Sequence, residues 1–188
     1  ARGAAGLVLA SRGGALARGG GREWAQLAAS GAAVRIARCD AAEAADARRL
    51  LGAAWGGDGG ALAAEGVWHA AGVLADGLLA RQSAATLARV YGPKAHAAWS
   101  VQRGCAALPL RACALFSSVA ALLGGAAQAN YAAANACLDA HAYARRAEGV
   151  AARSVQWPLV GGAGMGAAIF AVLREQQVAI AGLAGISL

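Results

Sequence analysis

Short apolar runs alternate with helical stretches along this chain of 188 residues, and the alternation restricts the fold more than any other feature. It is typical of βαβ units, whose strands lie parallel in one sheet. Strands are predicted at residues 7–10, 34–39, 112–116 and 152–157 and from residue 67, with helices at 21–30, 41–55, 129–146 and 167–177. The sequence therefore predicts an α/β fold with a doubly wound parallel sheet.

A longer helical stretch at residues 83–103 contains Gly92 and Pro93. Proline lacks a backbone N–H and clashes with the preceding turn, so it kinks or divides a helix. Alternatively, Pro93 begins a second helical segment with Lys94 in its first turn.

The composition excludes several classes of protein. Hydrophobic residues make up 59%, but alanine inflates this figure, and Ser117–Ser118 and Gly124–Gly125 interrupt the longest apolar run. That run is too short for a membrane span of about 20 residues. The net charge is +7, yet the arginines are scattered without a basic stripe, so no nucleic-acid partner is predicted. An anionic small ligand or an acidic protein partner explains the charge equally well.

The cysteines show neither CxxC pairing nor a histidine at metal-ligand spacing. Free buried thiols in a reducing compartment, the cytoplasm, are the expectation, with no metal site. The four cysteines are Cys39, Cys105, Cys113 and Cys137.

Polar and small residues follow the carboxyl ends of the predicted strands, where open α/β sheets bind their ligands. Because these strand ends meet at one edge of the sheet, the pattern predicts a dinucleotide site. The residues are Ser11, Arg12, Cys39, Asp40, His69 to Gly72, Ser117, Ser118 and the loop after Trp157.

Lys94 is the only lysine beside sixteen arginines, and it accompanies Ser118, Tyr131 and Asn135. The spacing of four places Tyr131 and Asn135 on one face of a helix. A phenol with a pKa of about 10 becomes an acid–base group at neutral pH only if a nearby cation favours its ionised form. Each residue alone has an ordinary structural explanation, but together they predict a site that transfers a proton to a carbonyl oxygen.

Several segments resemble the ketoreductase domains of polyketide synthases, which belong to the short-chain dehydrogenase/reductase superfamily. They are residues 67–74, 93–94, 115–120, 128–135 and 157–159, and the resemblance extends over about residues 5–165. It implies that Tyr131 is the proton donor and Ser118 orients the ketone, with Ser117 as the rival. Most short-chain dehydrogenases have lysine four residues after the tyrosine. This chain has Asn135 there and its lysine at position 94, as the polyketide ketoreductases do, so Lys94 and Asn135 complete the tetrad.

The resemblance also assigns residues that bind the cofactor. Ser11 and Arg12 match the pair that binds the adenosine 2′-phosphate, which implies NADPH. Asp40 matches the acidic position near the adenine. The remaining cofactor-binding positions are Ala70, Ala71, Gly72, Pro158 and Leu159, whereas His69 is predicted to be a structural histidine.

Three residues are predicted on the substrate side: Asp76, Leu123 and Gln128. In the family, a Leu-Asp-Asp motif marks one facial preference and a tryptophan eight residues before the tyrosine marks the other. Here the motif reads Leu74-Ala75-Asp76, and Leu123 occupies the tryptophan position. By resemblance this favours the D-3-hydroxy (B-type) product.

The glycine-rich turn that normally follows the first strand of such a domain is absent from the sequence before Ser11. By resemblance, the first strand belongs between the strands at residues 7–10 and 67–69. We therefore expect residues 1–188 to form one N-terminally truncated ketoreductase-like domain, a piece of a multidomain synthase, with an interrupted sheet.

The predicted function is NADPH-dependent reduction of a 3-ketoacyl group tethered to an acyl carrier protein. The expected partners are that carrier protein and neighbouring synthase domains. A catalytically inactive structural remnant is one alternative. A stand-alone 3-ketoacyl reductase is another, disfavoured by the exchange of Lys94 and Asn135.

Overall fold

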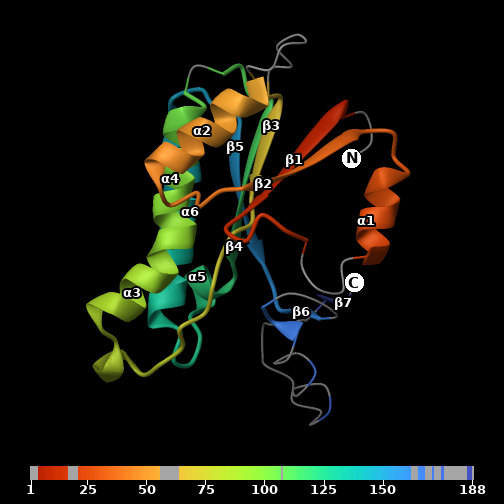
Figure 1. Ribbon diagram of the computed structural model, residues 1–188. Coiled ribbons are helices and arrows are strands. Elements are labelled where there is room, and N and C mark those ends of the chain that lie inside the picture. The colour runs from red at the N-terminus through yellow and green to blue at the C-terminus, as the bar shows by residue number, and fades with distance from the viewer. Residues whose placement is uncertain are drawn as a thin grey trace. The chain divides into compact units, whose positions relative to one another are not determined.

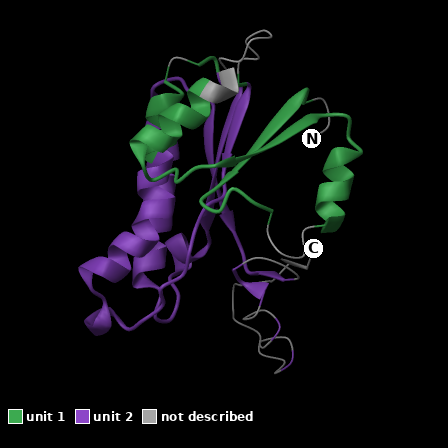
Figure 2. Cartoon of the chain, in the orientation of Figure 1, with its two compact units in different colours: residues 1–64, 99–109 green, residues 65–98, 110–188 purple. Residues whose placement is uncertain are grey.

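The computed structural model describes residues 4–16, 21–55, 64–106, 108–161, 165–167, 171, 175 and 186–187. They belong to two compact units, shown in different colours in Figure 2. The first comprises residues 1–64 and 99–109, and the second residues 65–98 and 110–188.

The first unit contains a parallel pair of strands, β1 (Gly6–Ser11) and β2 (Ala33–Arg38), in which Leu7 lies opposite Val34. Its helices are α1 (Gly21–Ala28), α2 (Ala44–Trp55) and most of α4 (Ala97–Gly104). Leu51 of α2 lies so close to Gly104 that a Cβ there would be 2.3 Å from its Cδ1 atom. The glycine therefore permits the contact between these helices.

The second unit is built on a parallel sheet with the strand order β3–β4–β5 (Figure 1). These strands are Gly66–His69, Ala112–Ser118 and Ala152–Trp157. The α/β class and the parallel strands are thus confirmed. The described strands of the two units form separate sheets, as expected if the sheet is interrupted between residues 7–10 and 67–69.

Helix α6 (Ala129–Ala147) packs on β4 and β5, and α3 (Ala84–Tyr91) packs beside it (Figure 1). Ala134, Leu138 and Ala142 of α6 are buried at a spacing of four, which is one stripe of a helix. Leu138 and Ala142 form the core with Ala98 and Leu115. The helix ends before Gly149, which has a φ of 83°, so its predicted end is confirmed.

The stretch at residues 83–103 agrees with the second alternative, because Pro93 lies at the start of a new helical segment that carries Lys94, but this segment is a π-turn. Helix α3 passes into a π-turn, η2 (Gly92–His96), and then directly into α4. The Ala97 N–H reaches the carbonyl of Gly92, five residues earlier. The proline is therefore accommodated by one wider turn rather than by a break.

Other elements refine the predicted boundaries. Helix α2 begins at Ala44 rather than at residue 41, because residues 41–43 form a turn bonded to Asp40. Short helices occur at η1 (Leu79–Arg81) and α5 (Ala120–Leu123). The predicted loop after Trp157 contains β6 (Val160–Gly161), which pairs with β7 (Ile186–Ser187). The helix predicted at residues 167–177 lies largely outside the described residues.

Within the described ranges, no helix is both long and apolar enough to cross a membrane. The cysteines are free thiols, with Cys39 and Cys105 buried, Cys113 half-buried and Cys137 exposed. Burial therefore applies to two of the four rather than to all. The same part of the chain holds no group of histidine, cysteine or carboxylate side chains that could bind a metal ion.

Candidate active site

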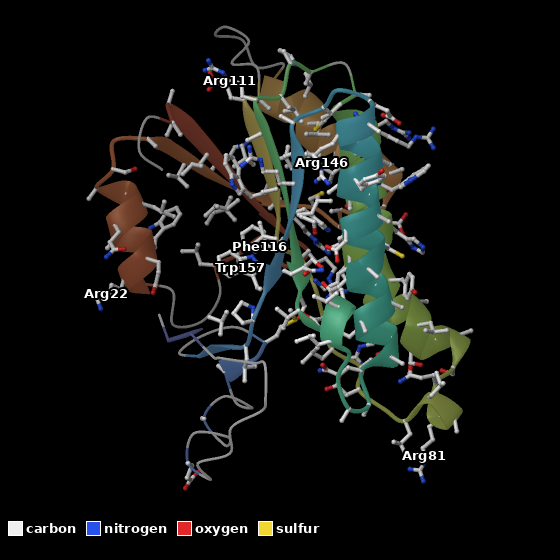
Figure 3. All side chains as sticks on the ribbon, turned by 180° about the vertical axis from the view of Figure 1, so that it is seen from behind. Arg22, Arg81, Arg111, Phe116, Arg146 and Trp157 are labelled. Carbon is white, nitrogen blue, oxygen red and sulfur yellow. The ribbon has the colours of Figure 1, made fainter. Side chains whose placement is uncertain are left out.

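Lys94 lies in the π-turn η2 of the second unit, and its side chain is buried, with the residue only 2% exposed. Its Nζ donates a hydrogen bond of 3.1 Å to the Phe116 carbonyl on β4 and lies 5.2 Å from the centre of the Tyr131 ring. The Phe116 ring packs against Trp157 on β5, with ring centres 5.4 Å apart (Figure 3). The structure thus brings Lys94 and Tyr131 together from separate elements.

Burial lowers the pKa of Lys94 from its ordinary 10.5 to about 8, and the negative charge of Asp139 acts in the opposite direction. A group with that pKa is still mainly protonated at neutral pH. A buried cation beside a phenol favours the ionised form of the phenol. The structure therefore places a buried cation against the face of the Tyr131 ring.

Asn135 is fully buried one turn after Tyr131 on α6. Its Nδ2 donates to the Tyr131 carbonyl at 2.8 Å, which fixes the amide. Its Oδ1 has no hydrogen-bond partner among the described residues. A buried polar atom without a partner is costly, and this oxygen is available to accept a hydrogen bond.

Ser117 and Ser118 at the end of β4 have different environments. Ser117 is buried and donates from Oγ to the Asn135 carbonyl at 3.2 Å. Ser118 is half-buried, and its Oγ accepts the Ala120 N–H at 3.2 Å, so its hydroxyl hydrogen can still be donated. The geometry favours Ser118 over Ser117 as the hydroxyl that contacts a substrate.

Three hydrogen bonds join the segment after β3 to the start of α6. Asn130 donates to the Ala75 carbonyl at 2.7 Å, and the Gly77 N–H donates to the Ala127 carbonyl at 2.8 Å. Gln128 Nε2 donates to the Asp76 carboxylate at 3.2 Å. Two of the predicted substrate-side residues are thus directly bonded to each other. The third, Leu123, is 57% exposed at the end of α5.

The predicted cofactor-binding residues of the second unit lie at strand ends. Ala70, Ala71 and Gly72 follow β3, and Pro158 and Leu159 follow β5. A Cβ at Gly72 would lie 3.0 Å from Cε of Lys94. The glycine therefore leaves room for the lysine side chain.

The predicted cofactor-binding residues of the first unit are held by local bonds. Ser11, at the end of β1, accepts the Gly14 N–H at 3.1 Å on Oγ. Arg12 is exposed. Asp40, after β2, accepts the Ala42 N–H at 3.1 Å. These contacts form turns at the ends of both strands.

Sequence reasoning missed two residues of this region, Asn130 and Asp139. Asn130 is 1% exposed and anchors the Ala75 backbone. Asp139 accepts hydrogen bonds from Ser154 Oγ at 2.5 Å and Gln156 Nε2 at 2.8 Å, and its charge acts on Lys94. Asp139 lies four residues after Asn135, so the spacing that linked Tyr131 to Asn135 could have found it as well.

A family model described as the KR domain matches residues 1–162 of the chain. This chain belongs to the KR, or ketoreductase, domain family. The described α/β architecture agrees with the fold of solved ketoreductases. The resemblance read from its motifs is confirmed.

Among the relatives of this ketoreductase, the polyketide synthase GfsA of Streptomyces halstedii is 46% identical over 153 residues, which are 81% of this chain and 2% of the relative. The spectinabilin polyketide synthase protein NorB of Streptomyces orinoci is 40% identical over 186 residues, 96% of this chain and 8% of the relative. The chain thus spans a small part of the synthases it matches.

Solved structures are similar as well. A structure of A-type ketoreductases from a modular polyketide synthase has a TM-score of 0.79 and 42% identity, covering 87% of this chain and 34% of that one. A ketoreductase domain from the bacillaene assembly line has a TM-score of 0.78 and 29% identity, covering 96% and 43%.

Ketoreductases of this family use a nicotinamide dinucleotide, NAD(P)H. The residues of the second unit fit the ribose of such a group. Asn135 offers a buried acceptor, and Lys94 has N–H donors beyond the one bonded to Phe116. A sugar hydroxyl both donates and accepts, so it complements this pair.

Proposed function

We propose that this ketoreductase reduces the keto group of a 3-ketoacyl thioester, carried by an acyl carrier protein, to a 3-hydroxyacyl group with NADPH. The observation that carries the proposal is the buried Lys94 ammonium 5.2 Å from the Tyr131 ring. Burying a charge is costly, so an ammonium buried against a tyrosine ring supports a functional role for the pair.

In the proposed reaction, the bound reduced nicotinamide supplies the hydride that the carbonyl carbon receives. Tyr131 donates its phenolic proton to the carbonyl oxygen, which Ser118 orients by a hydrogen bond. Lys94 stabilises the resulting phenolate. Asn135 accepts a hydrogen bond from the group that returns a proton to the phenolate. Atoms and charges balance, because the ketone gains one hydride and one proton.

We assign the adenosine end of NADPH to the first unit. Arg12 suits a 2′-phosphate, since a guanidinium binds phosphate through paired hydrogen bonds, and Ser11 adds a hydroxyl. Asp40 is assigned to the adenine. The backbone around Ala70, Ala71 and Gly72, together with Pro158 and Leu159, is assigned to the nicotinamide half.

On the substrate side, we assign Asp76, Gln128 and Leu123 to the acyl chain and its thioester arm. The retained Asp76 and the leucine at position 123 favour the D-3-hydroxy product. Two similar structures are described as A-type and A1-type ketoreductases, so the residue pattern and these relatives point to different products. Chiral analysis of the product from a simple 3-ketoacyl thioester decides between them, and an L-3-hydroxy product would refute our assignment.

The test of the proposed function is Tyr131→Phe in the full-length protein, with NADPH and a 3-ketoacyl thioester. We expect kcat to fall at least about a thousandfold, because the proton donor is lost. Tyr143→Phe is the matched control, since Tyr143 lies on the same helix and is 70% exposed. It should leave kcat unchanged.

Full activity of Tyr131→Phe would overturn the catalytic assignment. Failure of the wild-type protein to bind NADPH in a fluorescence titration would favour the alternative of an inactive structural remnant. The two measurements therefore separate a wrong residue assignment from a wrong function.

A further inference from the structure

His69, the last residue of β3, makes a buried hydrogen bond to the turn that carries Lys94. Its Nε2 lies 3.0 Å from the Lys94 carbonyl oxygen, across 25 positions of sequence. His69 is 6% exposed and Lys94 is 2% exposed, so water does not compete for the bond. The contact links the end of a sheet strand to the backbone of a proposed catalytic residue.

The π-turn disturbs the regular helical hydrogen bonds of this backbone. In an α-helix the Ala97 N–H would bond to the Pro93 carbonyl, but here it is shared between the carbonyls of Gly92 and Lys94. The Pro93 carbonyl thereby loses its helical donor, and Pro93 also contributes a backbone hydrogen bond to His69. The imidazole therefore adds a buried side-chain donor to the carbonyls of Pro93 and Lys94, at the point where the wider turn interrupts the regular helical bonds.

The chemistry of the contact determines the state of the ring. A carbonyl oxygen only accepts, so Nε2 carries the proton. Burial lowers the pKa of His69, and the nearby positive charge of Lys94 lowers it further. The neutral Nε2–H form therefore predominates at neutral pH. In this form His69 donates a hydrogen bond to the π-turn η2 and places no second positive charge beside Lys94.

We propose that His69 is a positioning residue: its Nε2–H holds the π-turn η2 in the geometry that sets the Lys94 ammonium between the Phe116 carbonyl and the Tyr131 ring. The role of Lys94 in this statement rests on the proposed function. The placement of Lys94 by His69 does not.

The test compares His69→Leu, which cannot donate, with His69→Gln, whose amide nitrogen donates at a similar reach. His96→Leu is the matched control, because His96 lies in the same π-turn but is exposed. All three are made in the full-length protein. We expect His69→Leu to lower kcat roughly 10- to 100-fold, as displacement of a catalytic group does, with a smaller change in KM. His69→Gln should recover most of the activity, and His96→Leu should equal the wild type.

A second readout does not depend on activity. Trace acetylation of the Lys94 amine, followed by mass spectrometry of its peptide across pH, reports how accessible and how protonated it is. In the described part of the chain, Asp139 acts on Lys94 by its charge, and the Tyr131 ring and His69 contact it. The charge of His141 acts on His69. We expect the wild type and His69→Gln to label slowly with a midpoint at about pH 8. His69→Leu should label faster, with a midpoint nearer 10.5.

A His69→Leu protein that is less stable but keeps wild-type kcat and labelling would reduce His69 to a structural residue and overturn the proposal. Equal losses in His69→Leu and His69→Gln would do the same. If His69→Leu does not fold, nitrogen NMR of the wild-type imidazole decides, since an Nδ1–H tautomer is incompatible with the proposed bond. Full activity of Tyr131→Phe would instead refute the proposed catalytic role of Tyr131. The difference in Lys94 labelling between the wild type and His69→Leu would still be expected.

Discussion

The two units hold their predicted site residues in opposite ways. The side chains of Ser11 and Asp40 in the first unit accept hydrogen bonds from residues two or three positions away, and Arg12, next to Ser11 in the chain, is exposed. In the second unit Lys94 is buried and bonded to Phe116, 22 positions away. Local turns suffice to present groups that are proposed to bind a cofactor at the protein surface. A charged side chain that is buried beside a phenol needs tertiary contacts to hold it there.

The strongest test of this contrast is Lys94→Met, which keeps the length of the buried side chain and removes its charge. We expect kcat to fall about a thousandfold, because a preorganised charge beside the reacting group is lost. Steady-state kinetics of the full-length protein measure the effect. Arg103→Met, on the exposed side of α4, is the control and should change kcat little. A loss under about tenfold would argue that Lys94 does not act on Tyr131.

The same burial makes stability depend on pH. Between pH 8 and 10.5 the unfolded chain binds more protons at Lys94 than the folded protein does, so the contribution of this group to stability rises with pH. The free energy of unfolding of the wild type minus that of Lys94→Met should rise by about 3 kcal/mol from pH 7 to above 10.5.

Denaturant titrations at several pH values measure this difference. Burial raises the pKa of Cys39, Cys113 and Tyr91, which act in the opposite direction, but they contribute equally to both proteins and cancel. Arg12→Gln should show no such trend. A flat difference for Lys94→Met would mean that Lys94 keeps its ordinary pKa.

Removal of Arg12 should produce an effect of a different kind. Arg12→Ala is expected to raise the KM for NADPH roughly 10- to 100-fold, because a hydrogen bond between two charged groups is lost. The value of kcat should be nearly unchanged. The KM for NADH should not change, which is the internal control. Equal effects on both cofactors would remove the assignment of Arg12 to the 2′-phosphate.

The smallest effect is expected at Asp139, which acts on Lys94 only through its charge. Asp139→Asn keeps an acceptor for Ser154 and should lower the pKa of Lys94 further, because the negative charge that raises it is gone. The basic limb of the pH profile of kcat/KM should then move to lower pH, with about a two- to fivefold loss near pH 8. Asp46→Asn in the first unit is the control, and a profile identical to the wild type would contradict the coupling.

Much of the architecture was predictable from local pattern. The strands at residues 34–39, 112–116 and 152–157 and the helix at 129–146 agree closely with β2, β4, β5 and α6. Hydrophobic alternation and helical spacing act over a few residues, and a sequence displays them directly. The π-turn was not predicted, because its geometry depends on a partner, His69, that is distant in the sequence.

The sequence by itself determined which groups the protein has for its chemistry. It provides one lysine, a tyrosine and an asparagine spaced by four, and two serines at a strand end. The tertiary structure decided which of them can act. It buries Lys94 beside Tyr131, engages Ser117 with the Asn135 backbone and leaves the Ser118 hydroxyl able to donate. The reason is physical: burial and the orientation of hydrogen bonds set pKa values and reactivity, and both arise only when distant segments pack together.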